Sequence, residues 1–276
     1  MNSVVTDEWR ETNAAPQDAR ARWPGAGLNQ PGLLDDERAT LHGGPWFADL
    51  SNALRIAILG TARVRTVASG TLLARRGDTP SAWIGVARGA LRLGSPLADG
   101  RAFTLEFIGP GQWFGDIALI DDRPLELDVV AQSAAKLLFV SKADLQRLVG
   151  HYDELGPALL KLNCQRLRYM FRRFEELQTL PLPQRLARQL QRLAVHFGRP
   201  VATGVCIGLA LSQTDLAEIV GASRQRVNRT LRQLHLEGIV RLGESRLQVC
   251  DPKRLDDVAH GRCLLGEVRR EELVAE

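Results

Sequence analysis

The stretch SQTDLAEIVGASRQRVNRTLRQL, residues 212–234, decides the fold of the C-terminal part of this chain. Ser212 precedes an apolar periodicity and Asp215 follows three residues later, a pattern typical of the reciprocal cap at the start of a helix. Gly221 then favours a tight turn, and Ser223 can cap a second helix. Two short helices joined in this way form a helix-turn-helix, so the sequence predicts a domain that binds double-stranded DNA.

The second helix of this motif carries the side chains that we expect to contact DNA. At about 100° per residue, its apolar residues fall on one side and its arginines and amides on the other. Arginine suits the two acceptors of guanine, Gln and Asn suit adenine, and Arg226 projects sideways toward a phosphate. A solvated face is the alternative interpretation of such a helix. The predicted DNA-binding residues are Ser223, Arg224, Gln225, Arg226, Asn228, Arg229 and Arg232.

The residues around this motif support the same interpretation. Residues 238–243 and 246–250 form two short alternating runs around a Gly-Glu-Ser turn, which predicts a β-hairpin wing, and Pro252 opens a last short helix through Asp257. The whole chain has a net charge of +4, yet residues 180–249 contain ten Arg, no Lys and four acidic residues. Such an asymmetry is typical of a domain that binds a nucleic-acid duplex.

Short strands separated by glycines dominate the N-terminal half. Their spacing predicts an antiparallel barrel or jelly roll, preceded by a short helix over residues 46–59. Residues 1–42 are polar and without a sustained period, so we expect a variable, partly disordered extension there. The expected strands cover residues 64–67, 71–74, 82–85, 90–93, 104–108, 128–131 and 136–140.

Between the two halves, the period becomes helical from about residue 152 to residue 178. Apolar residues recur there at alternating steps of four and three, the pattern of a two-helix seam. Pro181 and Pro183 end this helix and open the next domain. We therefore expect a dimerisation helix, although such a stripe also suits a protein core. The predicted dimer interface consists of Leu160, Cys164, Leu167, Phe171 and Phe174.

These motifs together resemble those of the cyclic-AMP receptor protein and fumarate-nitrate reduction regulator (CRP/FNR) superfamily of bacterial transcription factors. The resemblance covers about residues 43–258 and includes the spacing from ARRGD, residues 74–78, through FIGPGQWFGDIAL, residues 107–119. It implies a homodimer on palindromic DNA, with RNA polymerase as a further partner and activation as the family tendency. Gln225 stands where the family usually has Glu, so the family's usual half-site is not expected.

The resemblance also sets the expected domain organisation of an α+β protein. It implies an antiparallel, jelly-roll-like β-roll as sensor domain, a long dimerisation helix and a C-terminal winged helix-turn-helix. The expected boundaries are 1–42 for the extension, 43–150 for the cyclic-nucleotide-binding-like β-roll, 151–180 for the dimerisation helix, 181–258 for the DNA-binding domain and 259–276 for the C-terminal tail.

The same resemblance places a candidate effector pocket in the β-roll. In family members that bind cyclic AMP, a Gly-Glu pair holds the ribose and an Arg-Ser pair neutralises the phosphate. Here Gly115-Asp116 and Glu126-Leu127 occupy these places, so an acidic residue replaces the phosphate-binding arginine. We therefore expect no control by cyclic AMP, while a different ligand and no ligand both stay open. The candidate pocket consists of Phe114, Gly115, Asp116, Ile117, Ala118, Glu126, Leu127, Met170 and Phe171.

The sequence argues against several other classes of protein. It contains no phosphate-binding loop, HExxH or GxSxG motif, so we expect no enzyme. The four Cys are scattered and none precedes Cys164, so we expect neither a metal site nor an iron-sulfur cluster. Neither a bilayer-spanning apolar run nor a signal peptide is present, which predicts a cytoplasmic protein. The alternative function is a cyclic-nucleotide-responsive module whose C-terminal domain does not read DNA sequence.

Overall fold

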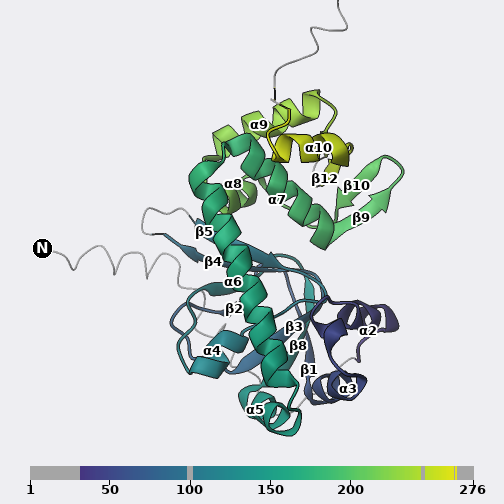
Figure 1. Cartoon of the computed structure of the whole chain (residues 1–276), viewed down its shortest axis with the longest axis vertical. Helices are drawn as coiled ribbons and strands as arrows, with labels where there is room; N and C mark the ends of the chain where they lie inside the picture. Colours follow the sequence, from purple (N-terminus) through teal and green to yellow (C-terminus); the bar gives the residue numbers. More distant parts are fainter. Residues whose placement is uncertain (1–31, 98–101, 244–245, 264, 266–276) are drawn as a thin grey trace, which may run out of the picture.

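The computed structural model describes residues 32–97, 102–243, 246–263 and 265. Its elements form three parts in chain order: a β-roll with flanking helices, the long helix α6 (Leu155–Thr179), and a helical domain with a small sheet. Figure 1 shows α6 running from the lower part of the molecule up to the C-terminal domain. This arrangement confirms the predicted α+β fold class with its antiparallel sheets, long helix and winged helix-turn-helix.

The β-roll consists of two antiparallel sheets with strand orders β1-β8-β3-β6 and β2-β7-β4-β5. Both sheets contribute to one apolar core, in which Val86, Leu91 and Leu137 are fully buried. The strands are β1 (Arg63–Val67), β2 (Leu72–Ala74), β3 (Ala82–Arg88), β4 (Leu91–Pro96), β5 (Ala102–Ile108), β6 (Trp113–Phe114), β7 (Asp128–Ala131) and β8 (Ala135–Ser141). The predicted strands are therefore confirmed, with small shifts at their ends, and β6 is added to them.

Short helices and aromatic rings cover one sheet of the β-roll and form a second core. The rings of Trp83 and Trp113 lie 4.4 Å apart between centroids, and Trp46 lies 5.5 Å from Trp83. Leu155 and Leu159 of α6 are buried in the same cluster, so this core anchors the first turns of α6. The helices are α2 (Asp35–His42), the 3-10 helix η2 (Phe47–Asp49), α3 (Asn52–Thr61), α4 (Asp116–Asp121) and α5 (Lys142–His151).

The structure corrects the prediction of one helix over residues 46–59. Leu50 has an extended backbone, with φ −78° and ψ 152°, between η2 and α3. Ser51 then begins α3, because its Oγ accepts a hydrogen bond from the Leu54 amide at 3.2 Å. The apolar residues keep a helical spacing across this break, so the periodicity alone does not reveal it.

Part of the segment predicted as an extension is a regular helix. In α2, Leu41 is fully buried, and the carboxylate of Glu37 accepts a hydrogen bond from Lys136 Nζ at 2.6 Å. Lys136 belongs to β8, so an ion pair between distant parts of the chain helps to hold α2 against the β-roll. Residues 1–31 and most of the tail 259–276 lie outside the described residues, so the predictions for them stay predictions.

The C-terminal domain combines helices with an antiparallel sheet of order β11-β12-β10-β9. The predicted wing is confirmed, because β11 pairs with β12 and Val240 lies opposite Val249. The strands β9 and β10 extend this sheet, and Gly204, with φ +113°, starts β10. The elements are α7 (Leu182–Phe197), β9 (Gly198–Val201), β10 (Gly204–Ile207), α8 (Gln213–Val220), α9 (Arg224–Leu236), β11 (Val240–Leu242), β12 (Leu247–Val249) and α10 (Pro252–Ala259).

Polar contacts fix the C-terminal domain to the β-roll and to α6. Glu218 on α8 accepts hydrogen bonds from Thr104 Oγ1 at 2.7 Å and from Arg92 Nη1 at 3.4 Å. Arg173 on α6 donates to the Ile219 carbonyl at 2.7 Å, and burial lowers the pKa of its guanidinium. Both contacts end on neighbouring residues of α8, so the first helix of the helix-turn-helix is held by two different parts of the molecule.

Buried charges along α6 continue this junction. Glu176 is buried and accepts hydrogen bonds from Arg188 Nη1 at 3.2 Å and from Arg192. The guanidinium of Arg192 also lies over the Tyr169 ring, 5.6 Å from its centroid. Burial raises the pKa of the Glu106 carboxyl on β5, while the neighbouring guanidinium groups act in the opposite direction. The β-roll, α6 and α7 thus meet at a cluster of opposite charges that are buried or half-buried.

Candidate nucleic-acid interface

Side-chain caps define the helices of the helix-turn-helix. Ser212 Oγ accepts a hydrogen bond from the Asp215 amide at 3.0 Å, and the Asp215 carboxylate accepts one from the Ser212 amide at 2.7 Å. Helix α8 ends at Gly221, whose φ is +64°. Ser223 Oγ accepts a hydrogen bond from the Arg226 amide at 3.4 Å and begins α9. The two caps and the glycine turn predicted from the sequence are therefore confirmed.

The inner face of α9 packs into the core of the C-terminal domain. Val227 and Leu234 are fully buried, and they share one apolar cluster with Leu216 of α8. Thr230 is also buried, and its Oγ1 donates a hydrogen bond to the Arg226 carbonyl at 3.1 Å, which satisfies the hydroxyl within the helix. This packing fixes the rotation of α9 about its own axis, so the opposite face is held toward solvent.

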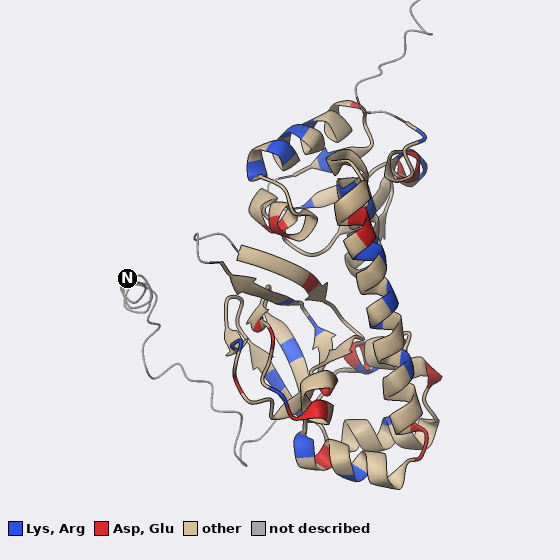
Figure 2. Ribbon diagram, turned by 60° about the vertical axis from the view of Figure 1, so that its left-hand side comes forward, with Lys and Arg blue, Asp and Glu red and all other residues tan. Residues whose placement is uncertain are grey.

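The outer face of α9 presents a row of cationic and amide side chains. The helix contains four Arg and no acidic residue, and Figure 2 shows the positions of basic residues in blue along one helix of the upper domain. Guanidinium groups on an exposed helix suit both phosphates and the acceptors of guanine. The exposed residues among the predicted DNA-binding set are Ser223, Arg224, Gln225, Arg226, Arg229 and Arg232.

Asn228 differs from the other predicted DNA-binding residues, because it is not fully exposed. It is half-buried, and its Oδ1 accepts a hydrogen bond from Gln213 Nε2 at 3.2 Å. Gln213 is the first residue of α8 and is absent from the residues predicted from the sequence. The packing of α8 against α9 brings together these two amides, which are fifteen positions apart in the sequence. No local sequence pattern indicates this contact.

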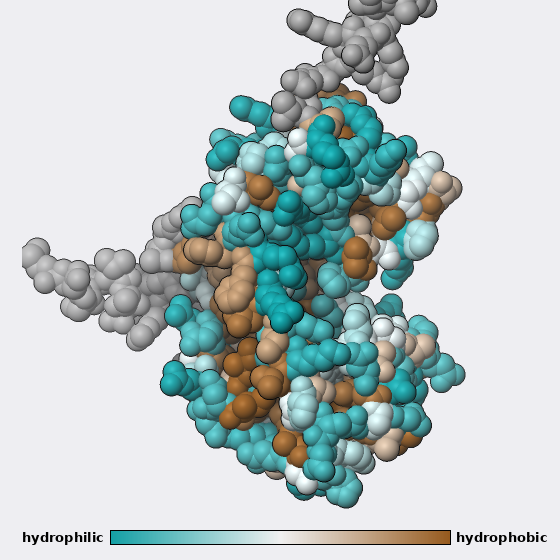
Figure 3. Space-filling view, in the orientation of Figure 1, coloured by the Kyte–Doolittle hydropathy of each residue, from teal (hydrophilic) through white to brown (hydrophobic). Residues whose placement is uncertain are grey.

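The predicted dimer residues lie on the exposed side of α6, opposite the residues that anchor this helix. Cys164 is exposed as well, and Ile117 and Ile120 of α4 extend the apolar surface. Figure 3 shows apolar side chains gathered along α6 and over its neighbour α4. An apolar patch of this kind is typical of an interaction surface. The exposed fractions of Leu160, Leu167, Phe171 and Phe174 are 67%, 53%, 63% and 66%.

Comparison with known protein families identifies both halves of the chain. Residues 184–258 match the Crp-like helix-turn-helix domain, and residues 64–152 match the cyclic nucleotide-binding domain. The chain belongs to the CRP/FNR superfamily of transcription regulators. The family and the fold are those of regulators, so the prediction that this CRP/FNR protein is not an enzyme is confirmed.

Three similar proteins illustrate the match of this CRP/FNR protein. The CRP-like cAMP-activated global transcriptional regulator of Mycobacterium tuberculosis is 28% identical over 60% of this chain and 75% of its own. The cyclic AMP receptor protein of Thermus thermophilus is 28% identical over 80% of this chain and 99% of its own. A solved CRP/FNR-family transcriptional regulator from Thermus thermophilus is 26% identical, with a TM-score of 0.61, over 73% of this chain and 100% of that chain.

The candidate effector residues of this CRP/FNR protein lie in different environments. Phe114, Asp116 and Ala118 are buried, whereas Gly115, Leu127 and Met170 are half-buried. Glu126 is exposed, and the exposed Ile117 and Phe171 belong to the apolar surface of α4 and α6. Three of the residues that the family resemblance assigns to one pocket, Ile117, Glu126 and Phe171, are therefore exposed on the protein surface.

Asp116 is the most constrained of these residues. It is fully buried, and its carboxylate accepts hydrogen bonds from Arg166 Nη1 at 2.8 Å and 3.0 Å and from Asn163 Nδ2 at 2.7 Å. The second Nη of Arg166 donates to the Trp113 carbonyl. Both partners of Asp116 come from α6, so the carboxylate at the position assigned to ribose binding connects the β-roll to α6.

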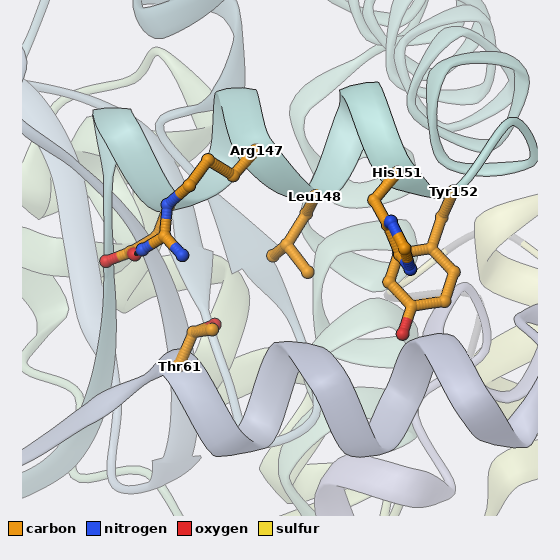
Figure 4. A pocket seen from close by; sticks show the side chains of 6 residues that line it. Thr61, Arg147, Leu148, His151 and Tyr152 are labelled. Atoms are coloured by element: carbon orange, nitrogen blue, oxygen red, sulfur yellow. Dashed lines mark hydrogen bonds and ion pairs between the residues drawn. The ribbon is translucent and has the colours of Figure 1, made fainter.

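A shallow hollow of about 430 Å³ lies between α3 and α5. Figure 4 shows the side chains of Arg147, Leu148 and His151 pointing from α5 toward α3. Arg147 pairs with Asp144, and Thr61 Oγ1 donates a hydrogen bond to the Ala57 carbonyl at 3.1 Å. Because these polar groups are engaged within the protein, we assign no ligand to the hollow.

The described part of the chain lacks two kinds of feature. It contains no cluster of three or more His, Cys, Asp or Glu side chains that would hold a metal ion. Within the same residues, no helix is long and apolar enough to cross a membrane. The predictions about metal ions, iron-sulfur clusters and a cytoplasmic location stay predictions.

Proposed function

We propose that this chain is a homodimeric, sequence-specific transcription regulator that binds palindromic DNA without control by cyclic AMP. The observation that carries the proposal is the outer face of α9, where four Arg are held outward by a buried inner face. A recognition helix of this form enters the major groove and contacts base edges from its first turns. RNA polymerase is a further partner in this proposal, because the CRP/FNR resemblance implies it.

The homodimer is supported by the exposed stripe on α6. Its residues follow the alternating spacing of a two-helix seam, and each of its large apolar side chains is more than half exposed in the single chain. Pairing α6 with the same helix of a second copy buries these side chains and places two α9 helices about a two-fold axis. Two recognition helices about one turn of DNA apart match a palindromic site.

Independence of cyclic AMP is supported by the contacts of Asp116 and by the charge at residue 126. The Asp116 carboxylate is buried and already accepts hydrogen bonds from Arg166 and Asn163. Glu126, at the position assigned to the phosphate, is exposed and acidic. A ribose hydroxyl would therefore compete with an internal ion pair, and a phosphodiester would face a carboxylate instead of a guanidinium.

Replacement of Arg229 is the direct test of sequence reading. We expect Arg229→Ala to relax base preference at one operator position and to weaken operator binding by about 1–3 kcal/mol. Arg226→Ala is the matched control, because an exposed arginine that contacts phosphate should affect all sequences alike. Operator sequences are first selected from a random pool, and affinities are measured at several salt concentrations. Wild-type affinity that does not fall as salt rises, or a pool without preference, would falsify the proposal.

Calorimetry tests the role of cyclic nucleotides. We expect titration of the full chain with cyclic AMP or cyclic GMP to give no saturable heat, because the Asp116 carboxylate is occupied by α6. We also expect operator affinity to be the same with and without either nucleotide. Saturable binding that raises operator affinity would overturn this part of the proposal. Saturable binding without sequence-specific DNA binding would support the alternative of a nucleotide-responsive module.

A further inference from the structure

Gln213 lies outside the recognition helix and still contacts one of the side chains on its outer face. It is the first residue of α8, and its Nε2 donates a hydrogen bond to Asn228 Oδ1 at 3.2 Å. Asn228 lies four residues after Arg224 and four before Arg232, so the three side chains follow one another along one face of α9. Both amides are half-buried, which places their contact between the two helices and beside the exposed row.

In the structure, this contact directs the carbonyl end of the Asn228 amide inward. An asparagine side chain has one carbonyl acceptor and an NH₂ group with two donors. The carbonyl oxygen is the atom that accepts from Gln213, so the NH₂ group is the end left to face outward. Holding the amide in one orientation also lowers the conformational entropy lost when it binds a partner.

We propose that Gln213 is a positioning residue for Asn228, and that the pair reads a hydrogen-bond acceptor on a base edge, with guanine preferred and cytosine disfavoured. This inference rests on the proposed function as a sequence-specific DNA-binding protein. Guanine presents two adjacent acceptors, N7 and O6, in the major groove. Adenine presents one acceptor beside a donor, and cytosine presents only the N4 donor.

The base expected opposite Asn228 differs from the one that the sequence alone predicts. An isolated Asn suits adenine, because its carbonyl accepts from N6 while its NH₂ group donates to N7. In this chain the carbonyl of Asn228 already accepts a hydrogen bond from Gln213. The donor end therefore becomes the main reading group, which moves the expected preference from adenine toward guanine.

The substitution Gln213→Glu tests this assignment, because a glutamate carboxylate only accepts hydrogen bonds. Asn228 must then donate its NH₂ group inward and present its carbonyl to the DNA. We expect the preference at the position read by Asn228 to move from guanine to the donor-bearing bases adenine and cytosine. Operators with guanine there should lose affinity by roughly tenfold relative to those with adenine. Selection from a random pool, followed by affinity measurements on operators that differ at this position, gives the result.

Matched variants separate positioning from charge and from folding. Asn228→Ala identifies the operator position, since its preference should be lost there, and adding Gln213→Glu to it should then change no base preference. Thr214→Glu adds the same charge at an exposed neighbouring position and should weaken all sequences alike. Gln213→Ala removes the inward contact without adding charge, and guanine should lose its advantage over adenine. Thermal unfolding monitored by circular dichroism confirms that each variant is folded.

The outcomes distinguish this inference from the proposed function. A wild-type protein that selects no sequence at any position contradicts the proposed function itself. A wild-type protein that selects an operator, with the same base preference in Gln213→Glu and Gln213→Ala, overturns the positioning role while the proposed function stands. A wild-type preference for adenine at the Asn228 position overturns the assignment of the donor end.

Discussion

Leu167→Glu is expected to convert the protein to a monomer and to weaken binding to a palindromic operator by about 10²–10⁴-fold. Leu167 lies in the middle of the exposed stripe on α6. In the proposed dimer, the glutamate introduced at residue 167 would be buried next to the same glutamate of the second copy. Two desolvated like charges at one contact oppose association. The second α9 then no longer benefits from the high effective concentration that the first provides.

The mass of the protein in solution and its affinity for full and half operators measure this effect. The monomer should bind a full palindrome and an isolated half-site with similar affinity, whereas the wild-type protein should strongly prefer the palindrome. Gln165→Glu is the control, because Gln165 is exposed on the same helix and outside the stripe. A Leu167→Glu protein that keeps a dimeric mass and wild-type affinity would show that α6 does not form the interface.

Arg166→Met is expected to destabilise the folded chain by about 3–5 kcal/mol, the range found when a buried ion pair loses one partner. The Asp116 side chain has no exposed surface, whereas that of Arg166 is 28% exposed. The cost therefore arises mainly from the carboxylate, which retains the single hydrogen bond from Asn163. Urea unfolding at neutral pH, followed by circular dichroism, gives the change in the free energy of unfolding.

A double variant distinguishes the buried charge from lost packing. Arg166→Met combined with Asp116→Asn removes the charge, and the amide of residue 116 can still hydrogen-bond to Asn163. Most of the lost stability should return, since replacing both members of a buried ion pair is often close to neutral. An Arg166→Met protein within about 1 kcal/mol of wild type would mean that water reaches the carboxylate and that the pair contributes little.

Local patterns predicted the helix-turn-helix well, because its signals lie within a few residues of one another. The reciprocal cap of Ser212 and Asp215, the turn at Gly221 and the cap at Ser223 are each formed by neighbouring side chains and backbone. The inner and outer faces of α9 follow from the helical period alone. The strands of the β-roll were predicted for the same reason, since each is a short run of residues bounded by turn residues such as glycine.

Contacts between distant residues were not accessible from these patterns. The Glu37–Lys136 pair joins residues 99 positions apart, and it helps to hold α2 against the β-roll. On α6, Arg166 and Arg173 carry buried hydrogen bonds, whereas Arg168 and Arg172 are exposed. The four arginines look alike in sequence, and only the packing of α6 against the β-roll and the C-terminal domain separates them.

The sequence by itself determined the type of protein and the face of α9 that points outward, because capping and amphipathic periodicity act within one or two helical turns. The tertiary structure decided which contacts individual polar groups make. Asp116 is held by α6, and the Asn228 carbonyl accepts a hydrogen bond from Gln213 on another helix. A hydrogen bond depends on distance and direction in space, and the chain fixes these between separate elements only when it packs.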